Sequence, residues 1–342
     1  NDSIDTYDMA AVLLPRASRY NLGALGQQLE IPLPATHRAL DDARVTREVY
    51  RKLYEMALQL PIHLLAELVR QSENLVWGAA LPFQQALRSR SKESISARQV
   101  RSSRLGPMFE AYESRNYPPL NPASTIYALD VDEVASVLEY NGAFSQHFPN
   151  YEYRPQQVEM LRSVADALSE GHHLLVEAGT GTGKSMAYLI PAAIWALQNK
   201  IRVVISTNTI NLQDQLINKD IPDLCASLEV DLRATLVKGR SNYLCPHRLE
   251  ALRHHGPQNV DEMRMLGKIL VWLQESQTGD RSEININGPT EREIWTRLSA
   301  EDDACTVDRC VGKMGGSCPF YRMRQSAQSA HLLIVNHALL LA

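Results

Sequence analysis

The chain has 342 residues, 44% hydrophobic and 22% charged, which is typical of a globular protein of two or three domains. No run approaches the roughly 18–20 apolar residues that span a bilayer, so no membrane partner is expected. The net charge of −4 excludes a strongly basic chain, so any nucleic-acid surface must be a local patch. The polar start without Met and without a signal peptide leads us to expect a piece of a longer, cytoplasmic protein.

Two segments precede the central part of the chain. Residues 1–60 alternate apolar patches with turn signals and become helical from about Asp41. Residues 61–150 are predicted to be mostly helical and to form a connector. Their basic run RSRSKESISARQVRSSR (88–104) has two interpretations, a solvated helix face or linker and a surface that contacts phosphate.

From Tyr151 the pattern changes to alternating helices and strands. VEMLRSVADALSEG has apolar residues at helical spacing, and Gly171 is predicted to end that helix. The following predictions are a strand in HHLLVEA, a helix in KSMAYLIPAAIWALQ, a strand in IRVVIST, a helix in NLQDQLI and a strand in RATLVKG. HLLIVNHALLLA opens with a further strand. This alternation predicts a parallel sheet with crossover helices, an α/β fold over residues 151–342.

The stretch EAGTGTGKS (177–185) has the spacing of a phosphate-binding loop. We expect positive φ at its three glycines, so that successive N–H groups point at phosphate oxygens. The helix that starts near Lys184 adds its positive end. Lys184 is predicted to neutralise the β- and γ-phosphates, and the Ser185 hydroxyl to bind Mg²⁺. The predicted nucleotide-binding set is Ala178, Gly179, Thr180, Gly181, Thr182, Gly183, Lys184 and Ser185.

The flanks of this loop each allow two interpretations. Upstream, Arg154 and Gln157 in YEYRPQQ could bind an adenine edge, or they could belong to a helix start with Pro155 in its first turn. Downstream, the polar residues 206–209 in VVISTNTINLQDQL follow a strand. They could contact nucleic-acid phosphates or cap the next helix.

In that order and spacing, YEYRPQQ, EAGTGTGKS and ISTNTINLQDQL resemble the first motor domain of superfamily 2 DNA helicases, within the DinG/XPD branch. LLIVNHALLLA is similar to the family's segment ahead of its second nucleotide motif. The resemblance implies a P-loop, RecA-like motor domain that uses ATP and Mg²⁺ to move 5′→3′ on single-stranded and forked DNA. It implies that Arg154 and Gln157 lie at the adenine and that residues 207–209 touch the translocating strand.

Four of the five cysteines form a pattern. Cys245 is followed, after residues 246–304, by Cys305, Cys310 and Cys318. No pair has the close spacing usual in structural zinc sites. The spacing leaves an iron–sulfur cluster, a zinc site and unligated thiols open. Cys225 lies outside the pattern and is predicted to be a buried core thiol.

The family resemblance favours the cluster. DinG/XPD-like helicases carry a [4Fe–4S] domain inserted after a KGRxNYLC strand, and this chain reads KGRSNYLC. The resemblance implies an insertion at about residues 240–320, with the ligands Cys245, Cys305, Cys310 and Cys318. It also implies that the insertion helps to separate DNA strands.

The N-terminal segment has a resemblance of its own. In HRALDDARVT the acidic residues could simply favour the start of the following helix. The wider pattern IDTYDMAAVLLP, YNLGALGQQLEI and THRALDDARVT looks like the C-terminal part of a DnaQ-like (DEDDh) 3′–5′ exonuclease with an RNase H-like fold. The resemblance implies that His37 is the general base and Asp42 a metal ligand. The family's other carboxylates would precede residue 1, so we expect no DNA cleavage by this chain alone.

The resemblance also implies that motif II and a second motor domain follow Ala342. We therefore expect an internal piece of a DinG-type helicase fused to an exonuclease, without robust ATP turnover of its own. One alternative is an ATP-gated nuclease that has lost unwinding, and the cysteine pattern disfavours it because a gate needs no strand-separating domain. The other is a nucleic-acid-binding ATP switch.

Overall fold

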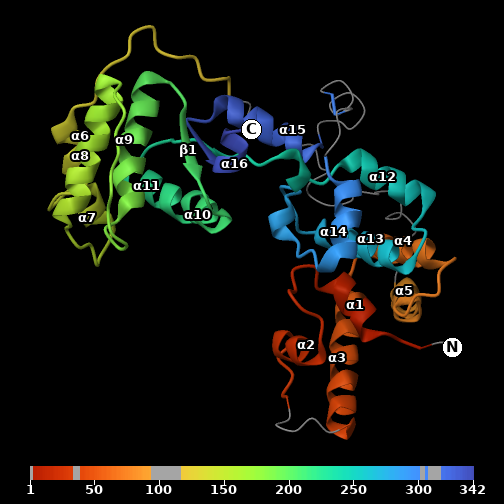
Figure 1. The fold of residues 1–342 in the computed structure, drawn as a ribbon. Helices are drawn as coiled ribbons and strands as arrows, with labels where there is room; N and C mark the ends of the chain where they lie inside the picture. Colours follow the sequence, from red (N-terminus) through yellow and green to blue (C-terminus); the bar gives the residue numbers. More distant parts are fainter. Residues whose placement is uncertain (1–2, 34–38, 94–116, 301–304, 307–316) are drawn as a thin grey trace. The chain divides into compact units, whose positions relative to one another are not determined.

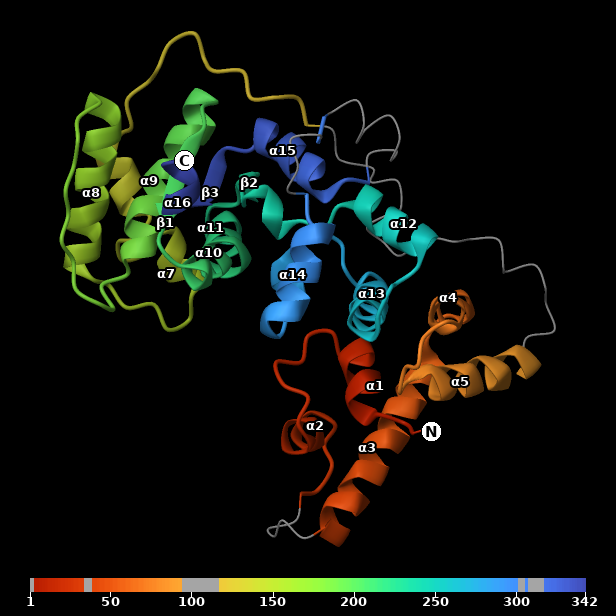
Figure 2. The same ribbon diagram turned by 45° about the vertical axis from the view of Figure 1, so that its right-hand side comes forward.

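The computed structural model describes residues 3–33, 39–93, 117–300, 305–306 and 317–342. The chain divides into two units, which Figures 1 and 2 show as ribbons. Unit 1 comprises Asn1–Tyr112 and Arg240–Tyr321, and unit 2 comprises Glu113–Gly239 and Arg322–Ala342. Each unit therefore combines segments that are far apart in the sequence.

Unit 1 is helical in its described residues. Its N-terminal part contains α1 (Thr6–Leu13), α2 (Leu22–Gln28), α3 (Ala39–Gln59), α4 (Ile62–Ser72) and α5 (Ala80–Glu93). Its second part contains a 3-10 turn (Arg240–Asn242), α12 (Pro246–His255), α13 (Val260–Trp272), a 3-10 turn (Arg281–Glu283) and α14 (Gly288–Leu298). Helix α15 (Pro319–Ser329) begins in unit 1, and its residues from Arg322 on belong to unit 2.

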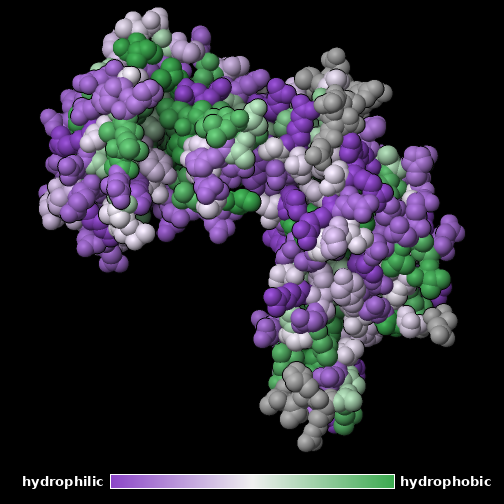
Figure 3. All heavy atoms as spheres, viewed as in Figure 1, coloured by the Kyte–Doolittle hydropathy of each residue, from purple (hydrophilic) through white to green (hydrophobic). Residues whose placement is uncertain are grey.

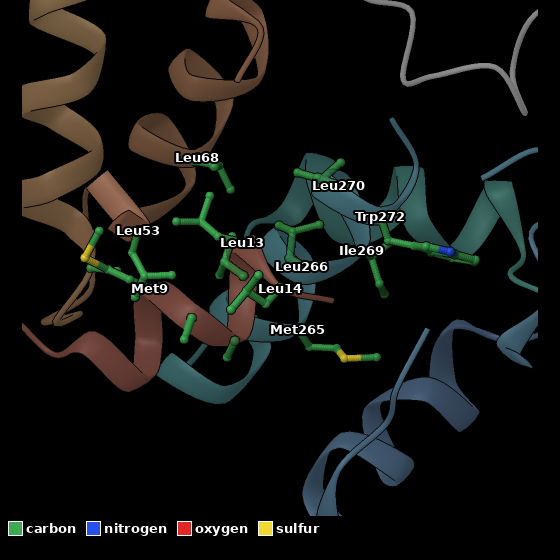
Figure 4. Packing of buried hydrophobic residues seen from close by; sticks show 14 of the residues in the cluster. Met9, Leu13, Leu14, Leu53, Leu68, Met265, Leu266, Ile269, Leu270 and Trp272 are labelled. Atoms are coloured by element: carbon green, nitrogen blue, oxygen red, sulfur yellow. The ribbon is translucent and has the colours of Figure 1, made fainter. Parts of the chain in front are cut away.

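The two parts of unit 1 share one hydrophobic core. Helix α1 is apolar almost all round, and its residues 9–12 have no exposed surface. It packs against α13, where Leu266 and Ile269 are also fully buried (Figure 4). Gly267 permits this approach, because a β-carbon there would lie 3.0 Å from Val12. Residues 3–14 are therefore integral to the packing of the segment that begins at Arg240.

Unit 1 also contains buried ion pairs, of which the first joins its two parts and the second lies within the second part. Arg264 on α13 approaches the Asp8 carboxylate to 2.7 Å. Lys268, one turn further on, is fully buried and lies 2.8 Å from Glu291 on α14. Burial lowers the pKa of Lys268, and the Glu291 charge opposes that shift. Charges removed from water need such partners, because an unpaired buried charge costs several kcal/mol.

Unit 2 contains the sheet. Its elements are α6 (Val131–Ser136), α7 (Ala143–His147), α8 (Pro155–Glu170), α9 (Lys184–Asn199), β1 (Val203–Thr207), α10 (Ile210–Gln215), a π-helical turn (Leu216–Asp220), α11 (Ile221–Leu228), β2 (Ala234–Leu236), β3 (Leu332–Asn336) and α16 (His337–Leu340). The strand order is β1-β3-β2, and both pairings are parallel. Val203 pairs with Leu332 and Thr207 with Asn336, so β1 and β3 end side by side. This confirms the predicted parallel sheet.

The predicted helices of unit 2 follow their local signals. Helix α8 ends where expected, because Gly171 takes the left-handed conformation with φ of 71° and closes the helix. Helix α9 packs against β1 and β3, and its buried face contributes to the core of the unit. Within the described ranges, no helix combines the length and the apolar character needed to cross a membrane.

The strand predicted in HHLLVEA is wrong. Residues 172–179 have no regular secondary structure, and Leu175 is 99% exposed. A strand is held by hydrogen bonds to a neighbouring strand, and no described strand pairs with this stretch. Strand β1 is only partly buried, with Val204 45% exposed. Hydrophobic side chains are visible on the face of unit 2 that carries β1 and α16 (Figure 3).

Candidate nucleotide-binding site

The phosphate loop lies between residues 172–177 and α9. Gly181 and Gly183 have φ of 82° and 80°, values that favour glycine because a β-carbon would be strained there. Gly179 lacks the positive φ that we expected. Gly183 is the residue before α9, so the helix presents its first N–H groups to the loop. This geometry is suited to anion binding at the helix start.

Lys184 folds back over the loop. Its Nζ donates hydrogen bonds of 2.7 Å to the Ala178 carbonyl and 3.1 Å to the Gly179 carbonyl. The Thr182 hydroxyl also donates to the Gly179 carbonyl, at 3.0 Å. The ammonium group is exposed, and phosphate oxygens are stronger acceptors for it than neutral carbonyls. Lys184 is therefore placed to exchange these loop contacts for phosphate contacts.

The start of α8 supports the loop. Arg154 donates to the Gly181 carbonyl at 2.9 Å, and Gln157 donates to the Gly183 carbonyl at 2.8 Å. Gln157 is only 8% exposed, and a β-carbon at Gly183 would collide with its amide. Pro155 is the first residue of α8, as a helix-start signal predicts. The adenine contacts of Arg154 and Gln157 stay a prediction.

The π-helical turn Leu216–Asp220 carries a buried acid that no motif predicts. Asp220 is 5% exposed and ends this turn, which packs against α9, the helix that carries Ser185. Burial raises the pKa of Asp220, and a 3.0 Å hydrogen bond from Gln215 opposes the shift. A single Asp in a helical stretch has no motif signal, so only the fold reveals its position.

Polar groups also meet at the ends of β1 and β3. The Ser206 hydroxyl lies 2.6 Å from Nδ1 of His337, a residue that the sequence analysis did not single out. The Thr209 hydroxyl accepts a 3.3 Å hydrogen bond from the Leu212 N–H and caps α10. The capping interpretation is therefore confirmed for Thr209. Contact of residues 207–209 with nucleic acid stays a prediction.

Three of the four predicted cluster ligands are described. Cys245 and Cys318 are buried and Cys305 is half-buried. Tyr243 links their surroundings, because its ring lies 5.9 Å from that of Phe320 and its carbonyl accepts a 2.9 Å bond from Ala300. The Cys305 Sγ lies 3.8 Å from the Ala300 carbonyl oxygen.

These contacts join the chain segments near the three described thiols, but the thiols are not grouped as the ligands of one metal site. Cys310 lies outside the described residues, and within the described ones no three metal-ligating side chains group together. Cys225 is half-buried beside the core of unit 2 rather than buried, and burial raises the pKa of its thiol. The assignment of the four ligands stays a prediction.

The predicted exonuclease residues are described only in part. His37 lies outside the described residues. Asp42 is exposed in the first turn of α3, where its backbone carbonyl accepts a 2.8 Å bond from Thr46. That position agrees with the interpretation that the acidic residues favour the start of this helix. Metal binding by Asp42 stays a prediction.

Comparison with known proteins agrees with this site. Residues 155–254 match the model of the DEAD/DEAH box helicase family, and these residues include α8, the phosphate loop, α9 and β1. The matched residues therefore include the whole phosphate loop. The match begins at the first residue of α8 and ends on α12.

Three relatives are named 3′-5′ exonuclease DinG. The chain is 32% identical to the one from Bacillus subtilis (strain 168), over 99% of the chain and 35% of the relative. It is 28% identical to the one from Staphylococcus haemolyticus (strain JCSC1435), over 83% and 30%. It is 27% identical to the one from Staphylococcus aureus (strain USA300), over 98% and 35%. The chain thus spans about a third of the length of these curated relatives.

Proposed function

We propose that this chain is the nucleotide-binding part of a DinG-type, ATP-dependent DNA helicase in which ATP hydrolysis drives unwinding. The observation that carries the proposal is the phosphate loop at the start of α9, with Lys184 over its carbonyls. The DEAD/DEAH box helicase match covers the same residues. Alternating strands and helices supply the parallel sheet that such a motor needs.

ATP and Mg²⁺ fit the groups present at this loop. Residues 178–184 would hold the phosphates through backbone N–H groups and the Lys184 ammonium. The Ser185 hydroxyl would be a magnesium ligand, because Mg²⁺ prefers oxygen ligands. Arg154 and Gln157, already at the loop through Gly181 and Gly183, would reach the adenine.

DNA would bind at the ends of β1 and β3. The hydroxyl and amide groups of residues 207–209 are suited to phosphate contacts, which carry no sequence information. We therefore expect low sequence selectivity, movement in the 5′→3′ direction, and single-stranded or forked DNA as partner.

A [4Fe–4S] cluster would be held by Cys245, Cys305, Cys310 and Cys318. Its support is the shared surroundings of the three described thiols and the KGRSNYLC stretch before the first of them. When bound, the cluster would brace residues of about 240–320 as a strand-separating insertion. A measurement of iron and zinc in protein purified without oxygen distinguishes a cluster from a structural zinc site. About four irons per chain support the cluster, and about one zinc without iron supports a structural zinc site.

The whole protein would also contain an exonuclease. The relatives' name is the support for this part, together with His37 and Asp42. Residues 1–60 would be the end of that domain, residues 61–150 a connector, and residues 151–342 the incomplete first motor domain.

The decisive experiment measures DNA-stimulated ATP hydrolysis and unwinding by the full-length protein and by its Lys184→Ala variant. We expect both activities in the wild type and neither in the variant. Unwinding absent while ATP controls cutting would favour a gated nuclease. Nucleotide binding without turnover would favour an ATP switch.

A further inference from the structure

A hydroxyl–imidazole contact at the ends of β1 and β3 lies outside the set of nucleotide-binding residues. The Ser206 Oγ lies 2.6 Å from Nδ1 of His337, a residue 131 positions further along the chain. The parallel register pairs Thr207 with Asn336 and so brings the two residues together. Helix α16 starts at His337 and contacts β1 (Figure 1). The contact therefore lies directly beside residues 207–209, where we propose that DNA binds.

This contact lies on the exposed face of the sheet. Side chains alternate between the two faces along a strand, so Ser206 shares a face with Val204 and not with Thr207. Thr207 is 3% exposed and faces the core, whereas Val204 is 45% exposed. His337 is also exposed. An exposed hydrogen bond adds little stability, because water can take its place, so stability alone is a weak explanation for the contact.

Hydrogen-bond chemistry gives the imidazole ring a donor for a ligand. A neutral imidazole has one N–H and one acceptor nitrogen, and the bond made by one nitrogen sets the role of the other. When the Ser206 hydroxyl donates to Nδ1, the ring proton lies on Nε2. A doubly protonated ring, whose Nδ1–H donates to the Ser206 oxygen, also carries a proton on Nε2. In both forms the Nε2–H points away from Ser206, and the bond to Ser206 restricts rotation of the ring.

The groups beside the ring favour a phosphate as the ligand. Residues 203–209 and 332–340 include no acidic side chain that would repel an anion, and no Phe, Tyr or Trp on which a base could stack. Asn208 and Thr209 are exposed next to the contact and add neutral donors. Donors of this kind bind the phosphate oxygens of nucleic acids.

We propose that His337 contacts a backbone phosphate of the bound DNA strand through Nε2–H, and that Ser206 is a positioning residue that holds the ring for this contact. This inference rests on the proposed function, because it requires a DNA strand at the ends of β1 and β3. It extends the DNA site from residues 207–209, which follow β1, to the end of the neighbouring strand β3. A phosphate contact carries no sequence information, so the contribution of His337 is the same for every base.

The test is the binding of labelled oligothymidylate to the full-length protein, followed by fluorescence anisotropy. His337→Ala should weaken binding roughly 10-fold, because a hydrogen bond to a charged phosphate is lost. The loss should be the same with oligodeoxyadenylate, since the contact is to the backbone. His173→Ala removes an exposed histidine from residues 172–177 of the same unit and is the matched control, expected to bind as the wild type does.

Ser206 variants test the positioning role. Ser206→Ala should reproduce part of the loss, and in a His337→Ala background it should add nothing, because its target ring is gone. The inference is overturned if His337→Ala binds oligothymidylate as the wild type does, or if its loss depends on the base. It is also overturned if Ser206→Ala has no effect, or has the same effect without the imidazole.

ADP affinity separates a DNA effect from damage to the fold, and it should be unchanged in each variant. If His337→Ala also loses ADP binding, Ser206→Ala decides. Weaker oligonucleotide binding with full ADP affinity in Ser206→Ala then supports the inference, and any other result overturns it.

ATP hydrolysis distinguishes failure of this inference from failure of the proposed function. A full-length wild type that neither binds oligothymidylate nor hydrolyses ATP in its presence would overturn the proposed function, and the role of His337 with it. A wild type with DNA-stimulated hydrolysis, beside a His337→Ala variant that needs no more DNA for half of that stimulation, would overturn only the role of His337.

Discussion

The Gln157 carboxamide donates a 2.8 Å hydrogen bond to the Gly183 carbonyl and so ties the first turn of α8 to the last residue of the phosphate loop. The bond is nearly buried and spans 26 residues of sequence. Gln157 contacts the end of the loop, whereas Lys184 contacts the Ala178 and Gly179 carbonyls near its start. The shape of the nucleotide site therefore depends on α8 as well as on the loop sequence.

Loss of this bond should weaken nucleotide binding. Gln157→Leu leaves the Gly183 carbonyl without its donor, at a cost of about 1–3 kcal/mol. We expect ADP affinity to fall roughly 10-fold, since 1.4 kcal/mol corresponds to a factor of ten. Gln156→Leu, one residue away and exposed, is the control. Equal ADP affinity in the two variants would show that the loop does not need α8.

The stability of unit 1 should depend on the buried ion pair between Lys268 and Glu291. Lys268→Met leaves the Glu291 carboxylate buried without its cation, which costs about 3–5 kcal/mol. Adding Glu291→Gln removes the charge while keeping an acceptor for the Asn287 N–H, which now bonds to Glu291 at 2.6 Å. The double variant should therefore recover much of the stability.

Urea unfolding followed by tryptophan fluorescence measures the effect. Three of the four tryptophans, at positions 77, 272 and 295, lie in unit 1. A double variant less stable than Lys268→Met alone would contradict the charge explanation.

The sheet in unit 2 should become less stable in acid. Burial, with the Arg233 charge beside it, lowers the pKa of His331, whose Nδ1 accepts a 3.1 Å bond from the Arg233 N–H. The unfolded chain binds this proton near pH 6.5, and the folded chain only at lower pH. The stability present above pH 6.5 is therefore lost as pH falls towards the folded pKa.

His331→Asn tests this dependence, because its side-chain oxygen can replace the Nδ1 acceptor without titrating. Hydrogen exchange of β2 and β3 at pH 7 and pH 5 is the measurement. We expect acid to increase exchange, corrected for its intrinsic pH dependence, more in the wild type than in the variant. The same increase in both would exclude His331 as the source.

Cysteine variants test the proposed metal site. Cys245→Ser removes a predicted ligand and should lower bound iron, whereas Cys225→Ser, in unit 2, should leave it unchanged. Iron per chain and visible absorbance are the readouts. Equal iron loss in both variants would point to general unfolding, and a full iron content in Cys245→Ser would remove it from the ligand set.

Local features of unit 2 could be predicted from the sequence. The loop EAGTGTGKS, helix α9 and the end of α8 at Gly171 depend on residues that are neighbours in the chain. Strands β1 and β3 were predicted because their apolar runs carry the signal by themselves. HHLLVEA carries the same signal and yet has no described partner, since pairing depends on a second strand and not on the run.

The contacts around the site were decided only by the tertiary structure. The phosphate loop could be predicted, because glycine φ angles and a helix start are set over a few residues. The sequence could not place the π-helical turn that ends at Asp220 against α9, His337 at Ser206, or α1 against α13. Each of these contacts joins residues distant in the chain, and packing of the two cores brings them together.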